Sequence, residues 1–129
     1  MKKIKKINCP EDVYDYASPI IEGKDKEHFA VILMNIKNHI LSMPIISIGG
    51  LASSVVDVRE VFKEAIKNNA ASVIMVHNHP SGSLEPSKED VNVTLRLKEA
   101  GKILGIQLLD HIIVNYDGKY VSLKEKGVI

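Results

Sequence analysis

The hydrophobic residues of this chain gather into short apolar runs separated by polar breaks. The runs are too short for full helices, and their content of Val, Ile and Leu predicts strands buried in a sheet. Five segments fit this pattern, at residues 28–36, 40–48, 71–76, 106–114 and 119–123. Pro44 lies inside the second segment and marks an edge or a bulge there, because proline cannot donate a hydrogen bond to a neighbouring strand.

Three further segments have apolar residues at helical spacing. The first begins at Pro10, with two acidic residues in its first turn. The second follows Asp57, whose spacing from Glu60 is typical of a capping box. The third begins at Ser87 and runs to Gly101 as its C-terminal stop. The resulting order, α-β-β-α-β-α-β-β, predicts a layered α/β sandwich with a mixed sheet.

Length and composition predict one domain with an aliphatic core. The 129 residues suit a single domain, which we expect to cover residues 1–129. Hydrophobic residues make up 45% of the chain but aromatic residues only 5%, so the core should depend on aliphatic side chains. The net charge of +1 does not favour a dedicated nucleic-acid binder, which usually needs a basic excess for phosphate contacts.

Cysteine content and the start of the chain exclude several classes of protein. Cys9 is the only cysteine, which excludes an intramolecular disulfide and a cysteine-built zinc site. The basic start is not followed by the apolar stretch of a signal peptide, and no apolar run is long enough to span a bilayer. We therefore expect a soluble cytoplasmic protein without a membrane partner.

Two histidines stand where a buried strand is expected to end in a loop. His77 and His79 follow the apolar run 71–76. Side chains alternate faces along an extended backbone, so both imidazoles should point to one side. Pro80 keeps His79 extended, because the residue before a proline is disfavoured in the α region. Taken alone, such a pair is more often a surface feature than a metal site.

A carboxylate further along the chain changes this interpretation. With Ser87 as the N-cap, Asp90 lies in the first helical turn and faces back toward the two histidines. Three protein ligands with an open fourth position for water are typical of catalytic zinc sites, where the pKa of the water falls to about 7. The plain alternative is a helix cap alone, and capping would compete with metal binding for the Asp90 carboxylate.

Hydrolysis also requires a general base that reaches the water without being a ligand. The candidates are Glu22, Glu27, Glu60 and Glu64. Glu27 is the best placed, since it precedes the strand that begins at residue 28 and can enter a site at the sheet edge. The other three fit a solvated turn or helix positions.

These residues resemble the JAMM (MPN+) metalloprotease motif in type and in spacing. The match consists of His77-x-His79-Pro80 followed by Ser87-x-x-Asp90, with a glutamate before an apolar strand upstream. The flanking sequence is similar to the RadC branch of that family, over most of the chain from about residue 10. The stretches that carry this similarity are residues 59–65, 77–82, 109–114 and 120–123.

The resemblance implies a JAB/MPN domain, a three-layer α/β/α fold similar to that of cytidine deaminases. It implies one zinc ion per chain on His77, His79 and Asp90. Glu27 would then move a proton from the water to the leaving amine, and Ser87 would donate a hydrogen bond to the oxyanion. Relatives in the wider family cleave isopeptide bonds, so the expected substrate is an unidentified protein or peptide. The helix-hairpin-helix region that precedes the domain in longer RadC sequences is not expected here.

Three other functions were compared with hydrolysis. A DNA-repair adaptor or interaction module with little or no hydrolytic activity is the main alternative, although such modules usually lose ligand residues. Two histidines and one carboxylate also suit non-haem iron oxygenases, but the nearby Ser87 favours hydrolysis. A zinc deaminase is excluded because its pair of cysteine ligands is absent. His111 is interpreted as a strand residue near the site with mainly a packing role.

Overall fold

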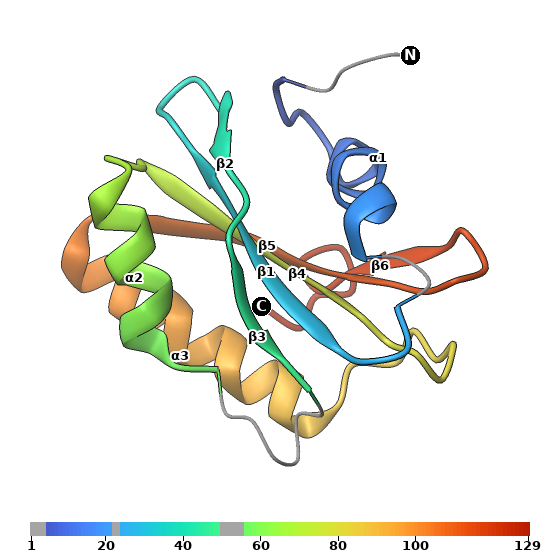
Figure 1. Ribbon diagram of the computed structural model, residues 1–129. Coiled ribbons are helices and arrows are strands. Elements are labelled where there is room, and N and C mark those ends of the chain that lie inside the picture. The colour runs from blue at the N-terminus through green and yellow to red at the C-terminus, as the bar shows by residue number, and fades with distance from the viewer. Residues whose placement is uncertain (1–4, 22–23, 50–55) are drawn as a thin grey trace.

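The computed structural model of the chain describes residues 5–21, 24–49 and 56–129 (Figure 1). Within these ranges the elements are α1 (Pro10–Ile21), β1 (His28–Met34), β2 (Ile40–Ser42), β3 (Ile45–Ile48), α2 (Val58–Lys67), β4 (Ser72–Asn78), α3 (Lys88–Leu104), β5 (Gln107–Val114) and β6 (Tyr120–Ser122). All six strands belong to one mixed sheet. The predicted α/β class is confirmed. Among the described helices, none has the length and apolar character needed to cross a membrane.

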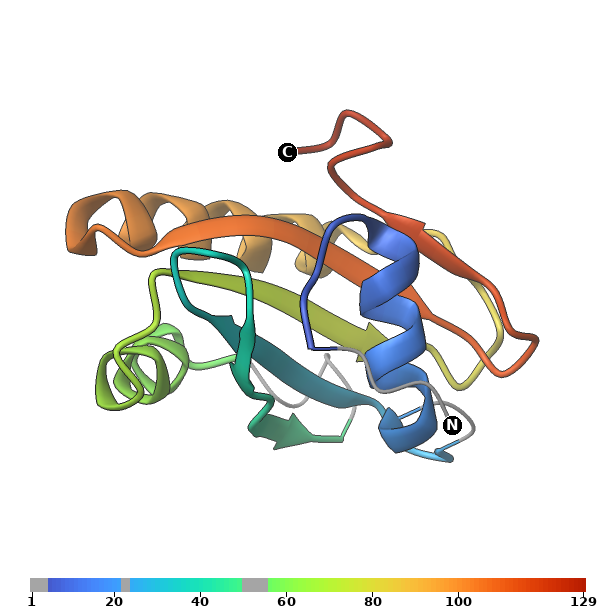
Figure 2. The same cartoon turned by 90° about the horizontal axis from the view of Figure 1, so that it is seen from above.

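The sheet lies between α1 on one face and α2 with α3 on the other (Figures 1 and 2). Along β1, Phe29, Val31 and Leu33 belong to the hydrophobic cluster that includes α2 and α3. The alternating residues Ile32 and Met34 belong to the cluster that includes α1. Both faces of the central strands are thus buried, which explains why their sequences are continuously apolar. The arrangement agrees with the three-layer fold that the family resemblance implies.

The path of the chain brings the end of β4 close to the start of α3. The order across the sheet is β2-β1-β4-β5-β6, and β3 also pairs with β1. β4 and β5 are parallel and are joined by the α3 crossover, whereas the other pairs are antiparallel. Because α3 runs back across the sheet, its first turn lies at the same edge as the carboxyl end of β4.

The prediction of one strand over residues 40–48 is wrong, because the segment is divided at residues 43–44. The two parts, β2 and β3, both pair with β1, and the register on β1 shifts in each pairing. Pro44 has no amide hydrogen, and its carbonyl accepts a hydrogen bond from the Val31 amide at 3.1 Å. The proline therefore causes the break, and the order becomes α-β-β-β-α-β-α-β-β.

The prediction that Gly101 ends the third helix is also wrong. α3 continues to Leu104 and is capped by Gly105, which has a left-handed φ of 74°. Gly101 is buried inside the helix, where an added Cβ would lie 2.2 Å from the Ile106 carbonyl oxygen. Its role is therefore to let the helix approach the chain that leads into β5.

Two smaller expectations also differ from the structure. β1 ends at Met34 rather than at residue 36, because the Asn35 side chain accepts hydrogen bonds from two amides of the turn that follows. Asp57 is the N-cap of α2, but its carboxylate accepts from the Arg59 amide, and no capping box with Glu60 is formed.

Candidate metal centre

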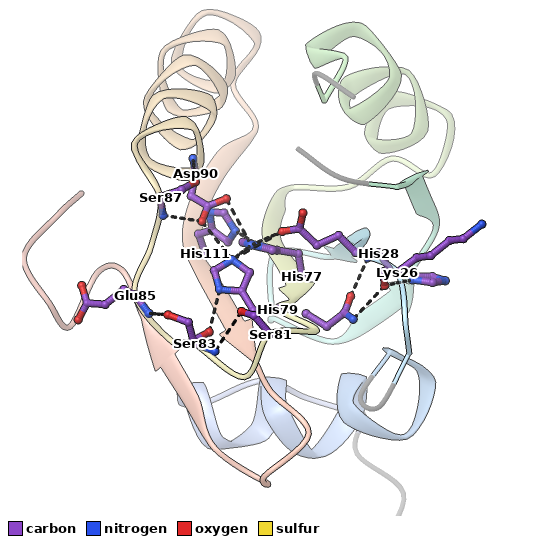
Figure 3. A network of polar contacts seen from close by, with 12 residues as sticks. Lys26, His28, His77, His79, Ser81, Ser83, Glu85, Ser87, Asp90 and His111 are labelled. Carbon is purple, nitrogen blue, oxygen red and sulfur yellow. Dashed lines mark hydrogen bonds and ion pairs between the residues drawn. The ribbon is translucent and has the colours of Figure 1, made fainter. Parts of the chain in front are cut away.

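His77 and His79 lie at the carboxyl end of β4, and their rings meet. His77 is fully buried in the last part of the strand. The His79 amide donates to the Val114 carbonyl of β5 at 3.0 Å, which keeps the backbone beside the sheet after β4 has ended. The two Nε2 atoms are 2.9 Å apart (Figure 3). Both imidazoles thus lie on one side, as strand alternation predicts.

Phe29 of β1 holds the plane of the His77 ring. The two residues are cross-strand partners in the β1–β4 pairing. Their ring centroids are 4.3 Å apart and their planes differ by 13°, so the rings are stacked. A stacked aromatic pair contributes about 0.5–1.5 kcal/mol beyond the area that it buries. The contact therefore restricts the direction in which His77 presents its Nε2 atom.

Asp90 approaches both histidines from the first turn of α3. The helix begins with a capping box, in which Ser87 Oγ accepts from the Asp90 amide and Asp90 Oδ2 accepts from the Ser87 amide. Asp90 Oδ1 lies 3.3 Å from His77 Nε2, and Oδ2 lies 3.3 Å from His79 Nε2. Oδ1 is buried and has no hydrogen-bond partner among the described residues. Capping thus uses Oδ2 and leaves Oδ1 available to a metal ion.

Glu27 completes the group from the loop before β1. Its Oε1 atom lies 3.7 Å from His77 Nε2 and 3.6 Å from His79 Nε2. Its side chain is 15% exposed whereas that of Asp90 is fully buried, so Glu27 faces the solvent side of the group.

The other candidate bases are not part of this group. Glu60 and Glu64 lie on α2, and the described cluster of possible ligands does not include them. Glu22 lies outside the described residues. Of the four candidates, Glu27 is therefore the one that the described structure brings to the histidines.

Asn78 connects β4 to the loop that carries Glu27. Its Oδ1 atom accepts from the His28 amide at 2.6 Å, and its Nδ2 atom donates to the carbonyls of Lys26 (3.1 Å) and Lys24 (3.4 Å). As a strand residue between two histidines, Asn78 points to the opposite face from theirs. The Asn78 side chain therefore fixes the loop from the other side of the sheet edge, where Figure 3 draws Lys26 and His28.

A second set of buried contacts lies behind His77. Its Nδ1 atom is 2.7 Å from His111 Nε2, and His111 Nδ1 is 2.6 Å from Thr94 Oγ1. Thr94 Oγ1 in turn donates to the Asp90 carbonyl at 2.6 Å. His111 and Thr94 are both fully buried. His111 thus contacts a residue of the site directly, beyond the packing role that the sequence suggested.

Burial and the Asp90 carboxylate set the charges of the centre. Burial lowers the pKa of His77 below its ordinary value and outweighs the nearby carboxylate. Burial also disfavours the charged form of His79, but Asp90 and the Ser83 carbonyl outweigh it and raise the pKa of His79. Burial would raise the pKa of Asp90, but the two histidines hold it well below its usual range. Asp90 is therefore an anion at neutral pH.

The four side chains could hold a metal ion. One possible ligand atom from each of Glu27, His77, His79 and Asp90 lies within 4.8 Å of the others. The Asp90 Oδ1 atom is buried without a hydrogen-bond partner among the described residues, as expected of a ligand whose ion would complete its contacts. Two imidazoles with carboxylates suit zinc or a related transition metal better than calcium or magnesium, which prefer oxygen ligands.

Sequence reasoning missed the parts that Thr94 and Asn78 play around the centre. Thr94 lies four residues after Asp90, which places it one helical turn away on the same face. That spacing was visible in the sequence. The contact of Thr94 with His111 was not visible, because it depends on how α3 packs on β5.

The chain is similar to known sequences over almost all of its length. The family model described as RadC-like JAB domain matches residues 7–128. A UPF0758 protein of Geobacillus thermodenitrificans (strain NG80-2) is 53% identical over 123 residues, which are 95% of this chain and 54% of that protein. A UPF0758 protein of Methanosarcina mazei is 51% identical over 125 residues, 97% of this chain and 54% of its own. The chain thus spans about half the length of these relatives.

Proposed function

The chain belongs to the RadC-like JAB domain family, and from that premise we propose that it is a zinc-dependent hydrolase of peptide or isopeptide bonds. The observation that carries the proposal is the convergence of two imidazoles and two carboxylates at one sheet edge. In the proposed site His77, His79 and Asp90 bind one zinc ion per chain. When bound there, zinc would supply Lewis-acid chemistry that lowers the pKa of water and polarises a carbonyl.

The two carboxylates differ in a way that supports different roles. Asp90 is fully buried and anionic, and its Oδ1 atom has no hydrogen-bond partner among the described residues, which suits a ligand. Glu27 is partly exposed and lies slightly farther from both histidines, which suits a general base. In this proposal Glu27 accepts a proton from the attacking water and then donates it to the nitrogen of the leaving amine.

In this proposal Ser87 stabilises negative charge on the substrate. Its Oγ atom accepts from the Asp90 amide at 3.0 Å, and this bond does not use the hydroxyl proton. The hydroxyl can therefore donate to an oxyanion that forms when water attacks the scissile carbonyl. A hydrogen bond of this type contributes about 2.7–4 kcal/mol to the transition state where it operates.

Metal analysis tests the ligand assignment first. We expect protein purified without added metal to contain about one zinc ion per chain, and Asp90→Ala to lower that content because an anionic ligand is lost. Glu60→Gln on the exposed side of α2 is the matched control and should keep the metal. Full zinc retention in Asp90→Ala would remove Asp90 from the proposed ligand set.

Turnover tests the role of Glu27. Peptide and isopeptide libraries should be screened with the wild type and with Glu27→Gln. We expect the variant to keep its zinc and to lose turnover by about 10²–10⁴-fold, the usual contribution of general acid–base catalysis. Equal turnover would show that another group is the base. DNA binding that weakens steeply with salt, in a protein that cleaves nothing, would instead favour the adaptor alternative.

A further inference from the structure

The contacts behind His77 allow their protons to be assigned from chemistry alone. A carbonyl oxygen only accepts hydrogen bonds, so the proton between Thr94 Oγ1 and the Asp90 carbonyl belongs to the threonine hydroxyl. A hydroxyl has one proton, and that proton is now committed. In the 2.6 Å contact between Thr94 Oγ1 and His111 Nδ1, the donor must therefore be the histidine N–H and the acceptor the threonine oxygen.

The proton between His111 and His77 is fixed in the same way. Within the described structure, the ring nitrogens of His111 contact only Thr94 and His77, and the ring is fully buried. A buried ring without a carboxylate partner is neutral and carries one proton, which is on Nδ1. His111 Nε2 is then an acceptor. In the 2.7 Å contact between this atom and His77 Nδ1, the donor must therefore be the His77 N–H. The His77 Nε2 atom is thereby left with its lone pair.

We propose that Thr94 and His111 are positioning residues that fix the tautomer of His77, so that its Nε2 lone pair faces the metal position. The chain of hydrogen bonds begins at the Asp90 carbonyl, and the atom that it prepares lies 3.3 Å from the Asp90 carboxylate. Asp90 thus acts twice on His77, once through its backbone and once through its side chain.

His79 obtains the same tautomer by a shorter route. Its Nδ1 atom is 2.8 Å from the Ser83 carbonyl, which can only accept, so His79 donates there and its Nε2 atom points toward Asp90. A backbone carbonyl is the usual partner of a metal-binding histidine. His77 is fully buried, and His111, which is bonded to Thr94, is the partner of its Nδ1 atom instead.

Nitrogen NMR on the metal-free chain tests the assignment directly. Long-range ¹H–¹⁵N spectra at mildly alkaline pH distinguish the protonated from the unprotonated ring nitrogen of each histidine. We expect His77 and His111 each to carry the proton on Nδ1 in the wild type and in Thr94→Ser. A wild-type spectrum with the His77 proton on Nε2 overturns the proposal, whatever the variants do.

Two matched variants of Thr94 test the consequence for the metal. Thr94→Val keeps the shape but removes the acceptor for His111, so we expect the His77 proton to move to Nε2 and the zinc affinity to fall by about 10–100-fold. Thr94→Ser should restore both. Ser72→Ala is the control, because Ser72 is buried in β4 and its Oγ has no hydrogen-bond partner among the described residues.

Failure of this inference can be separated from failure of the proposed function, on which its metal-binding part rests. Unchanged tautomer and zinc affinity in Thr94→Val would overturn the inference while leaving the zinc hydrolase in place. A wild-type chain with the expected tautomers that binds no zinc would instead count against the proposed function.

Discussion

Asp90 divides its two carboxylate oxygens between the start of a helix and the candidate metal centre. Oδ2 accepts the Ser87 amide in the capping box, while Oδ1 is buried beside His77 without a hydrogen-bond partner among the described residues. The sequence predicted that the two roles would compete for this carboxylate. A carboxylate has several acceptor positions and the cap uses one of them, so this geometry is compatible with both roles.

Substitution of Asp90 can separate the two roles. Asp90→Asn keeps an oxygen that can accept the Ser87 amide but loses the charge that the two histidines favour, so we expect loss of zinc and some loss of stability in the metal-free protein. Asp90→Ala should lose zinc and about 1 kcal/mol more stability than Asp90→Asn, because the cap is lost as well. Metal analysis and urea unfolding measure the two effects. Equal stability of the two variants would contradict the division of roles.

The raised pKa of His79 predicts how zinc binding depends on pH. The proton on His79 must leave before its Nε2 atom can bind a metal, and the raised pKa means that protons compete already above the ordinary value of 6.5. Zinc affinity should therefore fall as the pH is lowered through that raised pKa, by up to about tenfold per pH unit for one proton. His77, with its lowered pKa, should compete only at more acidic pH. A chelator competition between about pH 6 and pH 8 checks this, and a constant affinity would contradict it.

At the scale of elements, the end of β4 organises both sides of the sheet edge. Strand alternation sends His77 to the α3 face and Asn78 to the opposite one, where Asn78 fixes residues 24–28. The strand was predicted to end at Val76, two residues too early. Because β4 extends through Asn78, His77 and Asn78 point to opposite faces of the sheet and make different contacts.

We expect Asn78→Ala to loosen the loop that carries Glu27. The His28 amide would lose its acceptor, so its hydrogen exchange should become faster, while zinc content stays the same because no ligand is removed. The lost contacts should cost about 1–3 kcal/mol, since partly buried groups are left unpaired. Asn35→Ala is the matched control, because Asn35 fixes the exposed turn after β1. Unchanged hydrogen exchange of the His28 amide in Asn78→Ala would contradict the role of Asn78 in fixing the loop.

Gly101 and Gly105 offer a matched pair at the end of α3. Gly101→Ala would place a Cβ against the Ile106 carbonyl, and we expect it to cost about 1–3 kcal/mol or more as overpacking. Gly105→Asn meets open space, and asparagine tolerates a left-handed backbone, so its cost should be below about 1 kcal/mol. Urea unfolding compares them. A cost at Gly101 no larger than that at Gly105 would contradict the close approach of the helix to the Ile106 carbonyl.

The sequence predicted element types well and their ends less well, for physical reasons visible at particular residues. Apolar runs identified the central strands because both faces of β1 and β4 are buried. Pro44 was interpreted as marking an edge or a bulge, but whether the strand continued past it depended on pairing with β1. Gly101 was interpreted as the helix stop, whereas the chain reverses at Gly105 and the Ile106 amide then donates to the Gly101 carbonyl, which brings Ile106 against Gly101.

At the scale of the whole molecule, the candidate centre joins segments that are far apart in the chain. Glu27 comes from the start of β1, the histidines from the end of β4, and Asp90 from α3. The candidate ligands His77, His79 and Asp90 could be found from the sequence, because the His-x-His and Ser-x-x-Asp spacings are local. His111 was placed near the site, but its contacts with His77 and Thr94 could not be predicted, because they depend on the packing of α3 and β5 behind β4.

A metal held by these separate segments should stabilise the fold. Because the unfolded chain lacks the assembled site, zinc at 100 times its dissociation constant should add about 2.7 kcal/mol to the free energy of unfolding. Thermal unfolding with zinc and with a chelator measures this difference. Asp90→Asn should remove most of it, and a zinc effect of the same size in that variant would place the stabilising ion elsewhere.

The capping box has a consequence for the order in which the chain folds. Ser87 and Asp90 are three residues apart, so their mutual hydrogen bonds can form as soon as α3 begins to form. We expect the histidines to reach Asp90 later, when β4 has paired within the sheet and α3 has packed against it. An ion that binds only this late arrangement would leave the folding rate nearly unchanged and slow the unfolding rate. Zinc would then increase the kinetic stability of a fold that has already formed, because it slows unfolding without speeding folding.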